Sequence, residues 1–155
     1  MIPVESRAFT VPSHANQALQ VMSELRDQKV LCDVVLCVGA HQFPAHRVVL
    51  AGCSPYLRAM FTNGMLESEK NAIEIHDLEP ATMEAMLEFM YHGRVVITVE
   101  NVQSLMQGAS MFNLATLRNM CCQFLQLHID ASNCLGGLFT DFYFYCRVNS
   151  LTRFL

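Results

Sequence analysis

The sequence has no tryptophan, few charged residues and none of the short motifs that mark common enzyme or metal sites. Only 15% of its 155 residues are charged and 52% are apolar, which excludes disorder over most of the chain. Phosphate-binding glycine loops, the G-x-S-x-G motif and paired zinc-ligand spacings are all missing. We therefore expect no enzymatic activity, no metal site and no cofactor.

Charge and hydropathy also argue against nucleic-acid and membrane partners. Ten basic and fourteen acidic residues leave a net charge of −4, whereas a protein that binds nucleic acid presents a basic surface. No run approaches the roughly 18 apolar residues that a spanning helix needs, and residues 1–10 lack the apolar core of a signal peptide. The seven cysteines include no C-x-x-C. We interpret them as reduced, buried thiols of an intracellular protein, cytoplasmic with the nucleus as a second location.

Hydrophobic periodicity predicts short strands among helices, after one amphipathic helix at the start. The apolar side of that first helix consists of Ala15, Ala18, Leu19, Met22 and Leu25. Strands are expected at 33–38, at 41–43 with an end at Pro44, at 73–76, and as a short addition at 94–97. Helices are expected at 45–51, from Ser54-Pro55 to Asn63-Gly64, from Pro80 to Gly93, from Val102, and after Asn113. This order predicts an α+β fold, with a small sheet packed on a helical cluster.

Two places combine charge with apolar residues. Asp33 opens an apolar strand and Arg47 opens an apolar helix, so we interpret them as a mutually satisfied pair near buried surface, with a ligand-binding pocket as the alternative. Met65 and Glu67 follow a glycine break. They form either a solvated loop or a docking loop, in which Met65 fills a partner's pocket and Glu67 takes a hydrogen bond at its rim.

Several motifs in the same order resemble the BTB (POZ) domain. They are Leu31-Cys32-Asp33-Val34-Val35-Leu36, Phe43-x-Ala45-His46-Arg47-Val48-Val49-Leu50-Ala51, Ser54-Pro55-Tyr56-Leu57, Met60-Phe61-Thr62 and Leu87-x-Phe89-x-Tyr91-x-Gly93. Cys121-Cys122-x-Phe124-Leu125 and Asn133-Cys134-Leu135-Gly136 narrow the resemblance to the kelch-like subgroup. The resemblance covers about 15–136 and implies helices capped by a small, mainly three-stranded sheet, with an N-terminal dimerisation helix.

The resemblance also implies partners and contact residues. It implies a homodimer whose interface contains Ala15, Ala18, Leu19, Met22, Leu25, Asp33 and Arg47. It further implies an adaptor that binds the cullin-3 scaffold of a ubiquitin ligase. The family's φ-x-E docking loop corresponds to Met65 and Glu67, and the turn Phe112-Asn113-Leu114 resembles a secondary cullin contact.

The end of the sequence departs from the kelch-like pattern. We divide the chain into an N-terminal extension (1–12), a BTB/POZ domain (13–130), the start of a BACK-like segment (131–136) and a divergent tail of low order (137–155). No kelch repeat is present. We therefore expect a truncated isoform without a substrate-binding region.

Three functions remain open at this point. The first is a cullin-3 adaptor fragment that forms heterodimers with full-length relatives and occupies a cullin arm unproductively. The second is a transcription-type BTB module that recruits a co-repressor through a groove between subunits, although the zinc-finger spacings that normally accompany it are missing. The third is a dimerisation module without cullin affinity.

Overall fold

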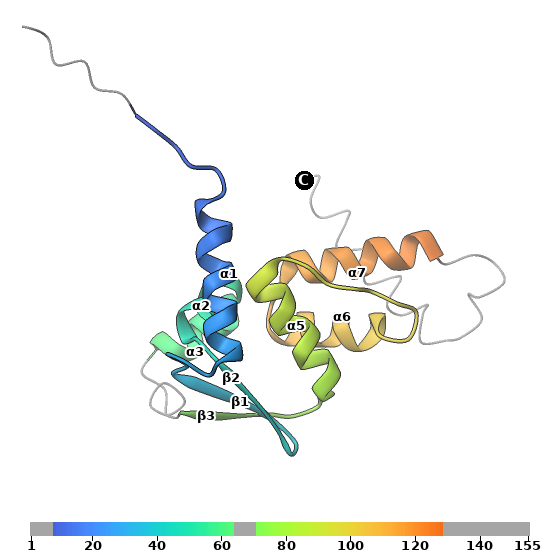
Figure 1. Cartoon of the computed structure of the whole chain (residues 1–155). Coiled ribbons are helices and arrows are strands. Elements are labelled where there is room, and N and C mark those ends of the chain that lie inside the picture. The colour runs from blue at the N-terminus through green and yellow to red at the C-terminus, as the bar shows by residue number, and fades with distance from the viewer. Residues whose placement is uncertain (1–7, 64–70, 129–155) are drawn as a thin grey trace, which may run out of the picture.

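The computed structural model describes residues 8–63 and 71–128. Its elements are α1 (His14–Asp27), β1 (Val34–Val38), β2 (His41–Ala45), α2 (Arg47–Cys53), α3 (Pro55–Thr62), β3 (Ala72–Ile75), α5 (Pro80–His92), α6 (Val102–Met111) and α7 (Ala115–His128). The sheet lies at one end of the helices, with α1, α2 and α3 close to it and α6 and α7 farther away (Figure 1). The predicted α+β class is confirmed.

The sheet has three strands in the order β2-β1-β3. β1 pairs antiparallel with β2 and parallel with β3. Alternate residues of β1 are buried because successive side chains of a strand point to opposite faces, so Val34, Leu36 and Val38 enter the core. In β3 the same alternation buries Ile73 and Ile75.

Two strand predictions are wrong in detail. Pro44 does not end the second strand but lies within β2, opposite Val35. An edge strand tolerates this because a residue without an N–H breaks no ladder bond on its outer side. Residues 94–97 form no strand, although three of the four are β-branched, because none of the described strands pairs with them.

Helix boundaries follow local chemistry. The Ser54 side chain caps α3 by accepting a hydrogen bond from the Leu57 N–H at 3.1 Å, and Pro55 occupies the first helical position. Gly93 ends α5 in the left-handed conformation, with φ of 66°, which a glycine adopts without steric cost. These two boundaries agree with the sequence predictions.

The core joins the buried side of the sheet to α5, α6 and α7. On α5, Met83, Met86, Leu87 and Met90 are all buried. A Cβ atom on Gly108 would lie 2.5 Å from Met86 Sδ, so a glycine is what allows α6 to approach α5 this closely. Among the described helices, none is long and apolar enough to span a bilayer.

Candidate protein-interaction surfaces

The apolar side of α1 is incompletely covered by its own chain. α1 packs against α5, but its buried residues are the polar Ser23 and Arg26. Of the five α1 residues predicted for the dimer interface, four are half-buried and Ala15 is exposed. The helix therefore presents apolar side chains that its own domain covers only in part.

A charged seam holds α1 on α5. The Arg26 guanidinium lies between Glu84 and Glu88 at 3.3 and 3.5 Å, and above the Tyr91 ring at 4.9 Å from its centroid. The Ser23 hydroxyl lies 2.8 Å from His92 Nε2. These directional contacts fix where α1 lies along α5, and so determine which residues of α1 remain exposed.

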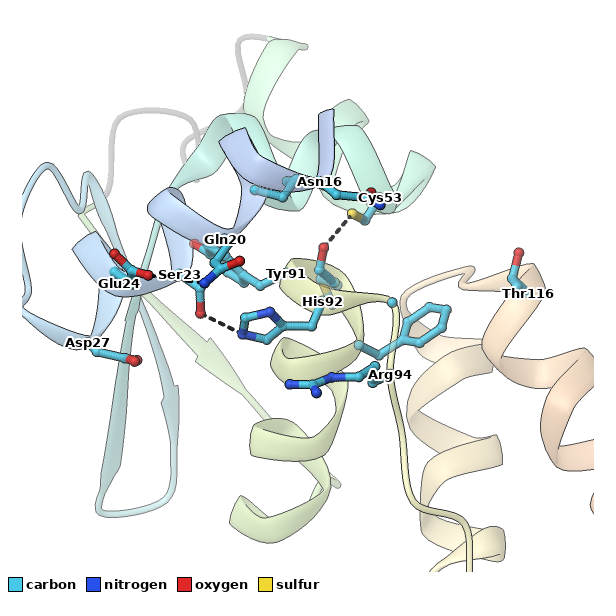
Figure 2. A pocket seen from close by; sticks show the side chains of 14 residues that line it. Asn16, Gln20, Ser23, Glu24, Asp27, Cys53, Tyr91, His92, Arg94 and Thr116 are labelled. Carbon is cyan, nitrogen blue, oxygen red and sulfur yellow. Dashed lines mark hydrogen bonds between the residues drawn. The ribbon is translucent and has the colours of Figure 1, made fainter. Parts of the chain in front are cut away.

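Beside this seam is a cavity of about 740 Å³. Figure 2 shows Asn16, Gln20 and Ser23 reaching it from α1, His92 from the end of α5, Arg94 from the segment after α5, and Cys53 from the end of α2. The Cys53 thiol donates to the Met90 carbonyl oxygen at 3.3 Å, and burial raises the pKa of this thiol. A protonated thiol is a poor nucleophile, so the cavity has no activated cysteine.

The segment after α1 is tied to the start of α2 by a buried network. The Val30 carbonyl lies 3.1 Å from His46 Nε2; because a carbonyl only accepts, we assign the ring hydrogen to Nε2. His46 Nδ1 then accepts from the Tyr91 hydroxyl at 2.8 Å, and the hydroxyl oxygen accepts from the His46 backbone N–H at 3.0 Å. Burial raises the pKa of Tyr91 to about 12.

Asp33 and Arg47 lie together, and each hydrogen bond between them uses a backbone atom of one of the two residues. The Asp33 carboxylate accepts from the Arg47 backbone N–H at 2.7 Å, and Arg47 Nε donates to the Asp33 carbonyl oxygen at 3.2 Å. Asp33 is exposed and Arg47 half-buried in the single chain. The carboxylate therefore serves mainly to satisfy an orphan N–H in the first turn of α2.

Exposed apolar side chains surround this point. Leu31 is 76% exposed and Val48 is 71% exposed. Leu31 also has a φ of 58°, a left-handed conformation that costs a residue with a Cβ roughly 1–2 kcal/mol. The fold therefore holds a large apolar side chain in solvent at an unfavourable backbone geometry, next to Asp33.

A second exposed feature forms where α3 begins beside the turn between α6 and α7. The Tyr56 ring is 46% exposed and packs edge-on against Phe112, with ring centroids 6.1 Å apart. Asn113 is exposed and has a φ of 52°. Tyr56 was not among the predicted contact residues, although it lies within one of the motifs that carried the resemblance.

The predicted cullin contact at 112–114 needs a correction. Phe112 and Leu114 are only 1% and 3% exposed, because both side chains enter the core on either side of the turn. Their side chains cannot contact a partner in this conformation, which leaves Asn113 as the exposed member of the three. Met65 and Glu67, the predicted docking loop, lie outside the described residues.

Four cysteines are reduced as predicted, but only Cys121 among them is also buried, and the prediction of a reduced thiol is wrong at Cys122. Cys32, Cys37, Cys53 and Cys121 are free, whereas Cys122 is disulfide-bonded. The number and spacing of cysteines do not determine which ones the fold brings within bonding distance. Over residues 8–63 and 71–128, no three metal-ligating side chains gather into a site.

Comparison with known proteins identifies the fold family. The BTB/POZ domain family matches residues 22–129. The chain belongs to the BTB/POZ family. Among solved structures, the BTB domain of zebrafish PATZ1 superposes with a TM-score of 0.72 at 29% identity, covering 79% of this chain and 99% of that one. The BTB domain of human gigaxonin gives a TM-score of 0.68 at 26% identity, over 77% of this chain and 98% of that one.

The relatives of this BTB/POZ chain include kelch-like proteins. Human Kelch-like protein 24 is 44% identical over 124 residues, which are 80% of this chain and 21% of the relative. Mouse Kelch-like protein 17 is 44% identical over 131 residues, 84% of this chain and 20% of the relative. The chain thus spans about a fifth of the length of these relatives. A BTB domain with such relatives is a protein-interaction module, typical of non-enzymatic adaptors.

Proposed function

We propose that this chain is a homodimeric adaptor module that binds a cullin-3 scaffold through a surface separate from its dimer interface. The single observation that carries the proposal is that two groups of exposed or partly exposed residues lie on different elements of the fold. One comprises the apolar side of α1 with Leu31 and Val48, which we name the α1 face. The other comprises Tyr56 and Asn113, which we name the Tyr56 face.

The α1 face is proposed as the contact with a second copy. Its residues are apolar and partly exposed, as expected of a surface that a partner covers. Leu19 and Met22 pack partly against the core of their own chain, but the fully buried positions of α1 are polar, so packing within the chain covers the apolar stripe only in part. A two-fold interface uses the same patch on both subunits. The same face would allow heterodimers with related full-length chains.

The Tyr56 face is proposed as part of the cullin contact. An aromatic ring that is half exposed and backed by a buried aromatic is typical of an interface anchor. The kelch-like relatives support this choice over a co-repressor function. Met65 and Glu67 belong to the proposed contact through the sequence resemblance alone.

Light scattering coupled to size exclusion tests the dimer on the full chain. Leu31→Glu and Val48→Glu each place a charge on the α1 face and should convert a dimer into a monomer. Val99→Glu is the matched control, because Val99 is also an exposed apolar residue, at 58%, but lies on the segment between α5 and α6. A wild-type monomer would refute the dimer, and a dimer unaffected by both substitutions would refute the α1 face.

Calorimetric titration with the N-terminal domain of cullin-3 tests the partner. Burying Met65 in a pocket contributes about 2 kcal/mol, so Met65→Ala should weaken binding roughly thirtyfold. Tyr56→Ala should weaken it by a similar factor, whereas Val99→Ala should not. Absence of binding by a folded dimer would refute the cullin proposal and leave a dimerisation module.

A competition assay tests the heterodimer. The added 155-residue chain should lower ubiquitination by a full-length kelch-like relative, because in a mixed dimer it replaces one of the relative's two arms. Unchanged ubiquitination at saturating amounts of the chain would count against this role.

A further inference from the structure

We propose that Ser54 is a positioning residue for the Tyr56 face, because its hydroxyl joins the start of α3 to the turn between α6 and α7. This inference rests on the proposed cullin-binding function. It adds a buried residue that contacts no partner but determines how the exposed ones are presented.

The Ser54 hydroxyl has two partners on different elements. It accepts from the Leu57 N–H at 3.1 Å, which caps α3, and it donates to the Phe112 carbonyl oxygen at 2.6 Å. Ser54 and Phe112 are 58 positions apart in the sequence. One oxygen atom therefore links two segments that are distant along the chain.

Both backbone polar groups of Ser54 are also hydrogen-bonded within the protein. Its N–H donates to the Leu50 carbonyl in α2, and its carbonyl accepts from the Arg58 N–H in α3, both at 2.9 Å. The side chain is fully buried. Ser54 is thus the junction of α2, α3 and the turn at Phe112, with each of its polar groups hydrogen-bonded inside the protein.

The two exposed residues of the Tyr56 face are immediate neighbours of the bonded groups. Tyr56 precedes Leu57, whose N–H is capped, and Asn113 follows Phe112, whose carbonyl is held. The Tyr56 ring also packs edge-on against the Phe112 ring. Fixing the distance from Leu57 N to Phe112 O through one hydroxyl therefore fixes the spacing of Tyr56 and Asn113.

Helix capping alone would not require this arrangement. An N-cap residue needs only an acceptor, and Asp or Asn would supply one. A hydroxyl is the small group that can accept and donate at once, and the Phe112 carbonyl is buried where it needs a donor. The second bond therefore accounts for a serine at this position in addition to its capping role.

The test compares three variants in the full chain. Ser54→Ala removes both bonds, Ser54→Thr keeps the hydroxyl, and Ser23→Ala is the control. Ser23 is also buried and its hydroxyl also forms a bond of 2.8 Å, but this bond lies in the seam between α1 and α5. Unfolding free energy is measured by denaturant titration, and affinity by calorimetry with the cullin-3 N-terminal domain, at a temperature where every variant is folded.

We expect Ser54→Ala to weaken cullin binding roughly tenfold. Without the two hydrogen bonds, the residues of the Tyr56 face must become ordered when they bind, and this ordering reduces the affinity. Ser54→Thr should recover most of that affinity. Ser23→Ala should also lose stability, although it breaks one side-chain hydrogen bond and not two, and should bind as the wild type does. This split separates positioning of the surface from a general loss of stability.

The outcomes that overturn the inference are distinct from failure of the proposed function. If the wild type binds and folded Ser54→Ala binds equally well, Ser54 has no positioning role and only this inference fails. Equal weakening in Ser23→Ala would also overturn it, because lost stability would then explain both. If the folded wild type does not bind at all, the proposed function fails and the role of Ser54 fails with it.

Discussion

The hydroxyl of Tyr91 is predicted to contribute measurably to stability, and Tyr91→Phe isolates it. The substitution removes one oxygen and keeps the ring, so the Arg26 guanidinium retains its position 4.9 Å from the ring centroid. What disappears is the partner of two buried atoms of His46, its backbone N–H and its Nδ1, at 3.0 and 2.8 Å. His46 is only 7% exposed, so water does not readily replace the lost contacts.

The magnitude follows from the cost of leaving buried polar groups without partners. Each such group costs about 1–3 kcal/mol. Local relaxation recovers part of the cost for two atoms of one residue, so we expect Tyr91→Phe to lower the free energy of unfolding by about 2 kcal/mol. For a chain of this length, that corresponds to a fall of about 6 °C in Tm.

Circular dichroism at helical wavelengths is the suitable assay, because the chain has no tryptophan to report on unfolding. Urea titrations should be run at equal protein concentration, since dimer formation would make stability depend on concentration. Tyr56→Phe is the matched control, because it removes a hydroxyl from a half-exposed tyrosine and should change stability by less than about 0.5 kcal/mol. Equal stabilities for wild type and Tyr91→Phe would refute the assigned network.

Three further predictions concern pH, packing and capping. Burial raises the pKa of Tyr91 from 10.0 to about 12. The stability that depends on the phenolic proton is therefore complete below about pH 10 and is lost between about pH 10 and 12. In urea titrations over this pH range, the free energy of unfolding should fall more steeply for the wild type than for Tyr91→Phe. Gly108→Ala should lower the free energy of unfolding by about 1–3 kcal/mol, and Tm with it, because the added Cβ would lie 2.5 Å from Met86 Sδ. An unchanged Tm would show that the Met86 side chain moves aside freely. Asp33→Ala should lower the free energy of unfolding, measured by urea titration, by about 1 kcal/mol, because the Arg47 N–H at the start of α2 loses its acceptor. A loss above about 3 kcal/mol would instead indicate a buried ion pair between Asp33 and Arg47.

The sequence could predict features that depend on a few neighbouring residues. Alternation of apolar and polar residues located β3, and Ser54-Pro55 and Gly93 located the start of α3 and the end of α5. These patterns work because side-chain direction, capping and left-handed backbone are decided within one or two turns of chain. Motif order went further and indicated the BTB/POZ fold, which the family match and the solved structures confirm.

The candidate surfaces could be predicted only in part. Residues on α1 could be selected by helical period, but period does not say that Ser23 and Arg26 would be the buried ones. Phe112 and Leu114 could be aligned with a family contact, yet both side chains enter the core. Tyr56 was not predicted as a contact residue, because the sequence does not distinguish an exposed aromatic residue from a buried one. The proposed dimer and cullin contacts remain predictions.

Local pattern therefore determined the elements, and long-range packing decided their chemistry. The sequence alone specified the α+β class, most of the helices and strands, and the family. Only the tertiary structure decided that Asp33 meets a backbone N–H of Arg47, and that the Ser54 hydroxyl bonds to a carbonyl 58 positions away. The reason is physical: capping and periodicity act between near neighbours, whereas the partner of a buried polar group is whichever atom the packed core brings within about 3 Å.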